Sequence, residues 1–168
     1  MRRFAGILLL VLVFSGCGHQ RPSANPAAGE SVAVLVEPGL KSNMNGAEEA
    51  QYRQVADYMR KDLVTRLQRQ GYEVEVLHQR SDFTPASGQH LLAVEIERYS
   101  PGSKAARILV GFGAGATSLD IAYTMVHGSG KTLVSATDGV GSSRDWHFCC
   151  RALNERLVET LALELADA

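Results

Sequence analysis

The segment that indicates the fold most clearly is SVAVLVEPGLKSNMNGAEEAQYRQVADYMRKDLVTRLQRQGYEVEVLH, residues 31–78. It begins with a short Val-rich run, residues 31–37, which is typical of a buried strand. Residues 47–70 carry larger apolar side chains at steps of three and four, which indicates an amphipathic helix. Residues 72–78 alternate apolar and acidic side chains, as a half-exposed strand does. A strand, a long helix and a second strand in this order permit a right-handed parallel crossover.

The ends of the expected helix have their own signals. Asn45 is a suitable N-cap, and Glu48 three residues later completes an Asx form of the capping box. Gly71 is a natural C-terminal stop, because glycine adopts the left-handed conformation that ends many helices. The residues expected to face the core are Tyr52, Val55, Met59, Leu63 and Leu67.

The remainder of the domain adds strands and a closing helix. Residues 91–99 and 117–127 alternate like strands, and residues 132–137 form the hairpin partner of the second across a Gly-rich turn. Residues 138–143 are expected to be a loop, and Ser142 with Asp145 resembles a capping box for the last helix. We therefore expect an α/β (α+β) fold, with a mixed sheet of about four to five strands and two amphipathic helices on one face. The expected apolar stripe of the closing helix is Trp146, Cys150, Leu153, Leu157, Leu161 and Leu165.

The N-terminus predicts export. Arg2 and Arg3 precede an apolar run, FAGILLLVLVF at 4–14, which is shorter than the roughly 20 residues that span a bilayer. Small residues and Cys17 follow, and this pattern resembles the lipobox of bacterial lipoproteins, which implies cleavage after Gly16 and lipidation of Cys17. An ordinary cleaved signal with a chance cysteine is the alternative.

The residue after Cys17 is Gly18 and not Asp, which by the sorting rule of enteric bacteria implies the outer membrane, with the protein facing the periplasm. Two or more acyl chains, such as palmitate, anchor a protein stably. Residues 17–30, rich in Pro, Gly, Ala and Ser, are expected to be the lipidated cysteine and a flexible tether. The signal peptide is then 1–16, and residues 31–168 form a single periplasmic domain.

Charge and cysteines exclude several classes of function. Without its two signal-peptide arginines the chain has 15 basic and 18 acidic side chains, a formal net charge of −3, and no basic run, so we expect no nucleic acid partner. Adjacent Cys149 and Cys150 could form only a strained disulfide. We expect them to be small buried hydrophobic residues, with metal or redox use together with His147 as the alternative.

Two motifs suggest nucleotide binding but lack its context. Residues 111–116, GFGAGA, fit a loose dinucleotide pattern, yet a strand-like segment follows where a helix is required. Residues 128–132, GSGKT, resemble the end of a P-loop without its first glycine, and they lie in a hairpin turn. We expect no cofactor, no metal, no catalytic residue and no enzymatic activity.

The glycine segment, the strand after it, the turn at Gly130-Lys131 and the closing helix resemble the bacterial lipoproteins grouped as domain of unknown function 4410. The resemblance covers most of residues 31–168 and implies address and fold, but no activity. Glycines allow close backbone approach, so this segment is a candidate for interaction. Its candidate residues are Arg107, Gly111, Gly113 and Gly115.

Two functions remain. The first is a non-enzymatic envelope interaction or assembly module that binds another envelope protein or itself through a sheet edge or the glycine segment. The second is a small-ligand or glycan-binding domain, which predicts a pocket near Asp120, Tyr123 or Arg107.

Overall fold

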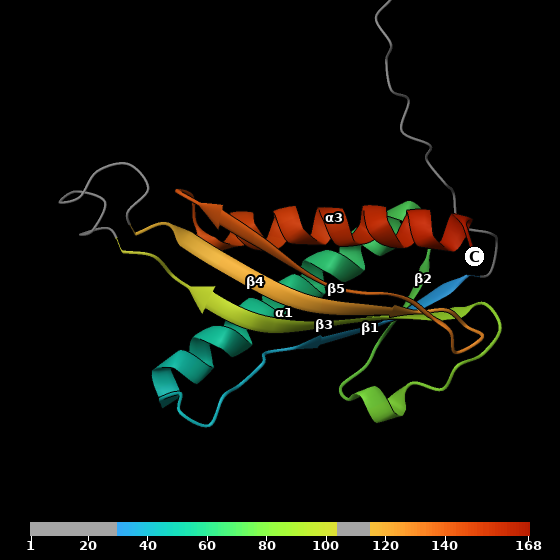
Figure 1. Cartoon of the computed structure of the whole chain (residues 1–168), viewed down its shortest axis with the longest axis horizontal. Coiled ribbons are helices and arrows are strands. Elements are labelled where there is room, and N and C mark those ends of the chain that lie inside the picture. The colour runs from blue at the N-terminus through green and yellow to red at the C-terminus, as the bar shows by residue number, and fades with distance from the viewer. Residues whose placement is uncertain (1–29, 104–114) are drawn as a thin grey trace, which may run out of the picture.

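The computed structural model describes residues 30–103 and 115–168 (Figure 1). Its strands and helices follow one another in the order expected for a mixed sheet with helices packed against it. The elements are β1 Ser31–Glu37, α1 Gly46–Gln70, β2 Glu73–Val76, the 3-10 helix η1 Arg80–Asp82, β3 Gln89–Ser100, β4 Thr117–Val126, β5 Thr132–Ser142 and α3 Trp146–Ala166.

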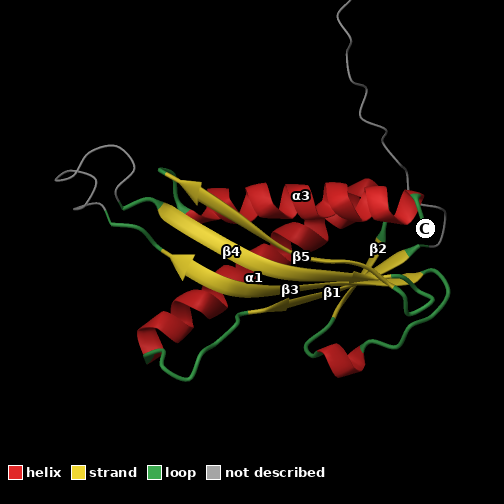
Figure 2. Cartoon of the chain, in the orientation of Figure 1, coloured by secondary structure: helices red, strands yellow, loops and turns green. Residues whose placement is uncertain are grey.

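The strands form one mixed sheet in the order β2-β1-β3-β4-β5 (Figure 2). β1 lies parallel to both β2 and β3, because α1 and the segment with η1 return the chain to the same end of the sheet. β3, β4 and β5 are antiparallel neighbours. The predicted mixed sheet of an α+β fold is confirmed.

Helix α1 begins and ends where its sequence predicts. The Asn45 side chain accepts hydrogen bonds from the N–H groups of Ala47 and Glu48, and the Glu48 carboxylate accepts from the Asn45 N–H at 2.9 Å. At the other end Gly71 has φ +98°, and its N–H donates to Gln68. Both caps use backbone groups that the helix leaves without intrahelical partners, which explains why the sequence located them.

Both helices pack on one face of the sheet, as expected, and the main core lies between the two layers (Figure 1). The strands contribute alternate residues, such as Val34, Val94 and Ile121, and the predicted apolar stripes of α1 and α3 meet them. Trp146 and Leu165, at the ends of the α3 stripe, are only partly buried. The fully buried larger side chains of this core include Met59, Leu63, Leu67, Leu92, Ile96, Leu119, Ile121, Met125, Leu153 and Leu161.

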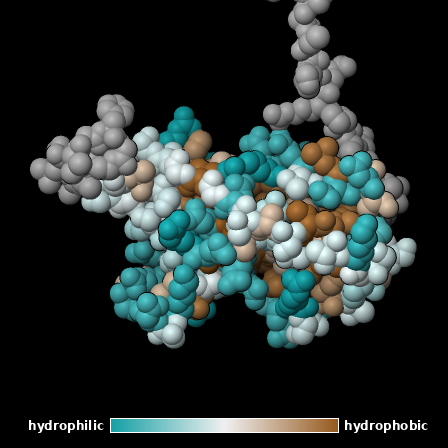
Figure 3. All heavy atoms as spheres, in the orientation of Figure 1, coloured by the Kyte–Doolittle hydropathy of each residue, from teal (hydrophilic) through white to brown (hydrophobic). Residues whose placement is uncertain are grey.

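A smaller apolar cluster lies on the opposite face of the sheet, and the sequence did not predict it. Leu35 and Leu91 are buried there together with Leu77 and half-buried Phe83 from the segment that carries η1. In Figure 3, hydrophobic residues reach the surface mainly in the right half of the view. Val76 ends the short edge strand β2 and is 39% exposed.

Two predicted boundaries near the C-terminus are wrong. Residues 138–142 are strand and not loop, because β5 remains paired with β4 up to Ser142 opposite Thr117. Helix α3 is capped by Asp145, which accepts from the Phe148 N–H at 3.0 Å, and not by Ser142, whose hydroxyl accepts from the Arg144 N–H. None of the described helices is both long enough and apolar enough to cross a membrane.

Candidate functional site

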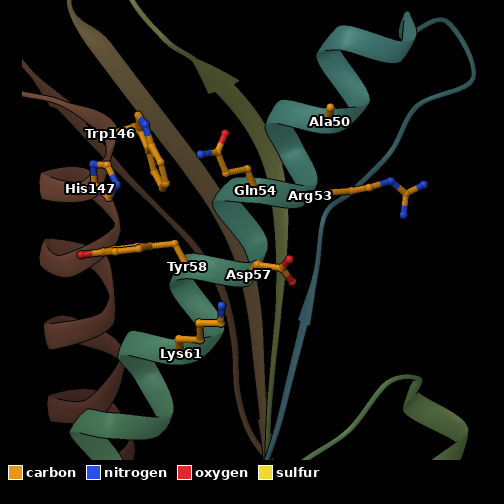
Figure 4. Close-up of a pocket in the computed structure, with 8 residues that line it drawn as sticks. All are labelled: Ala50, Arg53, Gln54, Asp57, Tyr58, Lys61, Trp146 and His147. Carbon is orange, nitrogen blue, oxygen red and sulfur yellow. The ribbon is translucent and has the colours of Figure 1, made fainter.

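Two surfaces of the domain have features of binding sites, and the first is a groove between α1 and the start of α3 (Figure 4). Its volume is about 560 Å³. The two helices lie side by side on the sheet, so the groove joins residues from the beginning and the end of the domain. It is lined by Ala50, Arg53, Gln54, Asp57, Tyr58 and Lys61 of α1 and by Trp146 and His147 of α3.

Three aromatic rings form one wall of this groove. The rings of Trp146 and His147 are stacked, with centroids 3.7 Å apart. Tyr58 meets both rings edge-on, at 5.3 Å from Trp146 and 4.7 Å from His147. Figure 4 shows Tyr58 and Trp146 pointing into the space between the helices. Edge-to-face and stacked contacts hold such rings in a defined arrangement, which gives a ligand a fixed aromatic surface.

Polar contacts fix this cluster to both helices. Asp145 caps α3 and thereby sets the position of its first turn, where the indole and imidazole project toward α1. The hydrogen bond from the Phe148 N–H holds the pKa of the Asp145 carboxyl below its usual range. Arg151 donates to the Tyr58 hydroxyl at 3.0 Å, and this bond raises the pKa of the guanidinium.

Polar side chains of α1 also line the groove. Arg53 points away from the groove centre along the outer side of α1, and 60% of its side chain is exposed beside Glu49. Gln54 and Lys61 add an amide and an ammonium group. An aromatic surface with such donors suits a ligand that has an apolar face together with hydroxyl or anionic groups.

The second surface is the part of the sheet's opposite face that β4 and β5 form. Along β5, Ser135, Thr137, Gly139 and Gly141 are exposed in alternation, whereas the residues between them are half-buried toward the helices. These exposed side chains are small, so the surface is flat. Flat, small-residue strands allow another backbone to approach closely.

A shallow hollow of about 480 Å³ lies beside this surface, where Arg98 pairs with Asp120 at 2.7 Å. Of the residues expected to mark a ligand pocket, only Asp120 lines it. Tyr123 packs against the core on the helix side, and Arg107 lies outside the described residues. Of the predicted pocket, the structure therefore contains only a hollow around the exposed ion pair of Arg98 and Asp120.

Comparison with known families identifies the domain. The family model described as Domain of unknown function (DUF4410) matches residues 28–140, which is more than half of the chain. The chain belongs to the DUF4410 family. The resemblance noted from the glycine segment and the following strand is confirmed, and no curated protein matches the sequence.

A solved structure shares the fold of this DUF4410 domain at low sequence identity. A PelC variant from Paraburkholderia phytofirmans, described as a dodecamer, is 14% identical, with a TM-score of 0.51 over 80% of this chain and 90% of that one. A neuraminyllactose-binding hemagglutinin homolog from Helicobacter pylori is 13% identical, with a TM-score of 0.42 over 81% of this chain and 83% of that one. At these identities the first likeness shows a shared fold, and the second is too weak to add to it.

The predicted interaction segment of this DUF4410 domain is described only at its end. Gly115 has φ +71°, a backbone conformation that favours glycine, and its carbonyl accepts from the Ser103 N–H at 3.0 Å. This bond joins the two ends of the segment. The lipidation site and the other candidate residues lie outside the described residues, namely Cys17, Arg107, Gly111 and Gly113.

The cysteine pair is buried in the core, as expected. Both thiols are free, and both residues are fully shielded from solvent. Burial raises the pKa of Cys150 to about 12, so it stays a thiol at neutral pH. His147 instead points into the groove, so the three residues do not form one ligand set. Within residues 30–103 and 115–168, no three His, Cys, Asp or Glu side chains lie close enough to hold a metal ion.

The contact between His90 and His127 was not predicted from the sequence. His90 is buried, its Nδ1 accepts from the Gly128 N–H at 3.3 Å, and its ring lies 4.9 Å from that of His127. Burial, and next the neighbouring His127, lower the pKa of His90. The arrangement ties the β4–β5 turn to the start of β3.

The aromatic groove was also missed. Trp146 was assigned to the apolar stripe of the closing helix and Tyr58 was not singled out, and only the packing of α1 against α3 brings the two rings together. One local signal could have indicated the groove. Trp146 and His147 are adjacent at the start of a helix, where the apolar stripe uses only Trp146, so the His147 ring has no role in the stripe.

Proposed function

We propose that this protein is a lipid-anchored envelope lipoprotein whose folded domain is a non-enzymatic interaction or assembly module. The chain is exported, cleaved after Gly16 and lipidated at Cys17. It is held at the periplasmic face of the outer membrane, where it binds another envelope protein or a second copy of itself.

Support for the anchor comes from the N-terminal sequence. Arg2 and Arg3, the apolar run at 4–14 and the small residues before Cys17 have the order of a lipoprotein signal. Gly18 supports the outer membrane. The Pro- and Gly-rich segment before β1 lets the domain reach partners away from the bilayer.

One observation carries the interaction proposal: both helices cover a single face of the sheet, and β5 ends that sheet as a long strand with a flat, small-residue outer face. Exposed sheet edges are a recurring way to bind another chain. The shared fold adds weight to self-association, because PelC is described as a dodecamer.

The test is crosslinking in living cells with a tagged full-length chain, followed by identification of the crosslinked proteins. The matched control is Cys17→Ala, which keeps the domain but lacks the lipid site. We expect a reproducible partner, either another protein or a second copy, that is lost in the control. Recovery of no partner by a correctly anchored protein would contradict the proposal.

A second candidate is the binding of a glycan or another small ligand in the groove of Tyr58, Trp146 and His147. The specific observation is the fixed aromatic surface beside hydrogen-bond donors, which suits the apolar face and the hydroxyls of a sugar ring. Trp146 is the only tryptophan of the chain, so its fluorescence reports directly on this groove.

The experiment is a titration of the full chain with neutral and anionic oligosaccharides while Trp146 emission is recorded. A saturable change that weakens in Tyr58→Ala but persists in Tyr72→Phe, a variant in the core away from the groove, would support ligand binding. Emission that stays constant with every sugar would leave the interaction module as the better proposal.

A further inference from the structure

The two edges of the sheet differ in length and charge. β2 has 4 residues, and two of them, Glu73 and Glu75, are acidic. β5 has 11 residues, and Asp138 is its single charged side chain. Short charged edges resist pairing with another chain, whereas a long edge of low charge offers backbone groups that can extend the sheet. β5 is therefore the edge that is suited to accept a further strand.

The bonds of Gly139 show which backbone groups of β5 face outward. Its N–H donates to Asp138 Oδ1 at 2.7 Å, and its carbonyl accepts from Arg156 Nη2 at 3.4 Å. A residue in an antiparallel ladder turns its N–H and C=O toward the same neighbour, so both groups of Gly139 face away from β4. Orientation repeats every second residue, which puts the N–H and C=O of Ser135 and Thr137 on the outer side as well.

Side chains cover the outward backbone groups of β5 at only one end of this edge. Arg156 of α3 pairs with Asp138 at 2.9 Å and covers Gly139, so this position is closed to a partner strand. Ser135 and Thr137 are exposed, and no strand of the described residues lies beyond β5. The open part of the edge is thus a short segment centred on Ala136.

We propose that this segment pairs with the same segment of a second copy, antiparallel about a two-fold axis at Ala136. The inference rests on the proposed interaction module and names its partner. In this register Ser135 of each copy exchanges hydrogen bonds with Thr137 of the other, and the guarded groups of Gly139 are not needed.

The pairing is self-complementary in charge and shape. Asp138 lies opposite Val134 of the second copy and not opposite another acid, and small side chains meet on the flat face. A two-fold interface uses the same patch on both copies and closes after two, so the edge does not propagate into a filament. The two sheets become one continuous sheet with the helices of both copies on the same side.

The test uses a cysteine placed on the proposed axis of the full-length protein in its membrane. In Ala136→Cys the two new cysteines face each other with Cα atoms about 4.5 Å apart, within the range of about 4.4–6.8 Å for disulfides. The matched control is Ala122→Cys, which makes the same change on the interior strand β4. Cys149 and Cys150 are buried and add no background.

We expect Ala136→Cys to run mostly at twice the monomer mass without reductant and to return to monomer with it, while Ala122→Cys stays monomeric. Adding Ser135→Pro, which removes one outward N–H that an edge strand can lose, should abolish the dimer, whereas Ser135→Ala should keep it.

A monomeric Ala136→Cys protein would overturn this inference. If crosslinking in cells still recovered a partner, the interaction module would stand with another contact surface. Equal dimer formation by Ala122→Cys would also overturn the inference, because it would show random collision.

Discussion

Asn154 is the polar side chain that joins α3 to α1 inside the core, and its replacement tests how the two helices are held together. It is fully buried, and its Nδ2 donates to the Met59 carbonyl at 2.9 Å and to Asp62 Oδ2 at 3.0 Å. Its Oδ1 has no hydrogen-bond partner among the described residues. We compare Asn154→Ala, which removes the amide, with Asn154→Leu, which replaces it by an apolar group of similar size.

The magnitudes follow from these contacts. A hydrogen bond to a neutral carbonyl contributes about 0.5–1.5 kcal/mol, and one to a charged group about 1.5–3 kcal/mol. Asp62 is partly exposed and keeps its 2.8 Å ion pair with Arg66, so the lower half of the second range applies. Asn154→Ala should therefore lower the free energy of unfolding by about 2–4 kcal/mol. Asn154→Leu loses the same bonds, but it removes the unpartnered Oδ1 and buries apolar surface, so it should lie within about 1 kcal/mol of the natural chain.

The assay is urea unfolding of the full chain, followed by Trp146 fluorescence and far-UV circular dichroism. Equal slopes for the three proteins would show that the midpoints report stability alone. Equal destabilisation by Asn154→Leu and Asn154→Ala would refute this prediction. It would show that the hydrogen bonds of the amide, and not the cost of burying its unpartnered Oδ1, decide the packing of α1 on α3.

Three further predictions concern the glycines, the buried histidine and the anchor. Gly39 has φ +59°, and an added Cβ would collide with the Ile96 carbonyl, so Gly39→Ala should lower stability by about 1–3 kcal/mol. The control Gly46→Ala has open space at the start of α1 and should not lower stability. Equal urea midpoints for the two variants would contradict this prediction. Burial lowers the pKa of His90 in the folded chain, so the unfolded chain binds the proton more readily and stability should fall as the pH drops below about 6.5. Urea midpoints at pH 7 and pH 5 should differ less for His90→Leu than for the natural chain, and an unchanged difference would assign the pH dependence to other groups. Gly18→Asp should move the protein from the outer to the inner membrane fraction, and an unchanged distribution on membrane separation would argue against enteric sorting.

Much of the fold could be predicted from local sequence, because its signals act over a few residues. The N-cap of α1 needs only Asn45 and Glu48, and its end needs only Gly71. The alternation in β3 and β4 identified the residues that face the helices, such as Val94 and Ile121. The end of β5 had no such signal, since Gly139 and Gly141 disfavour a strand locally and only pairing with β4 maintains it.

The candidate sites were harder to predict. Tyr58 and Trp146 meet because α1 and α3 lie side by side on the sheet. The sequence around either residue does not indicate that the two are in contact. The smaller cluster of Leu35 and Leu91 was missed for a related reason. The segment with η1 folds back over the opposite face, which alternation within one strand cannot reveal.

The sequence by itself determined the expected address, the order of the elements, the caps of α1 and the family resemblance. Each of these depends on residues that are close along the chain. Only the tertiary structure decided which strands lie at the edges, which face the helices leave open and which rings meet in the groove. Edges and grooves arise from contacts between distant segments, whose free energy depends on packing in space and not on any local pattern. The edge of β5, where Arg156 covers Gly139 and the outward backbone groups of Ser135 and Thr137 stay open, is such a feature.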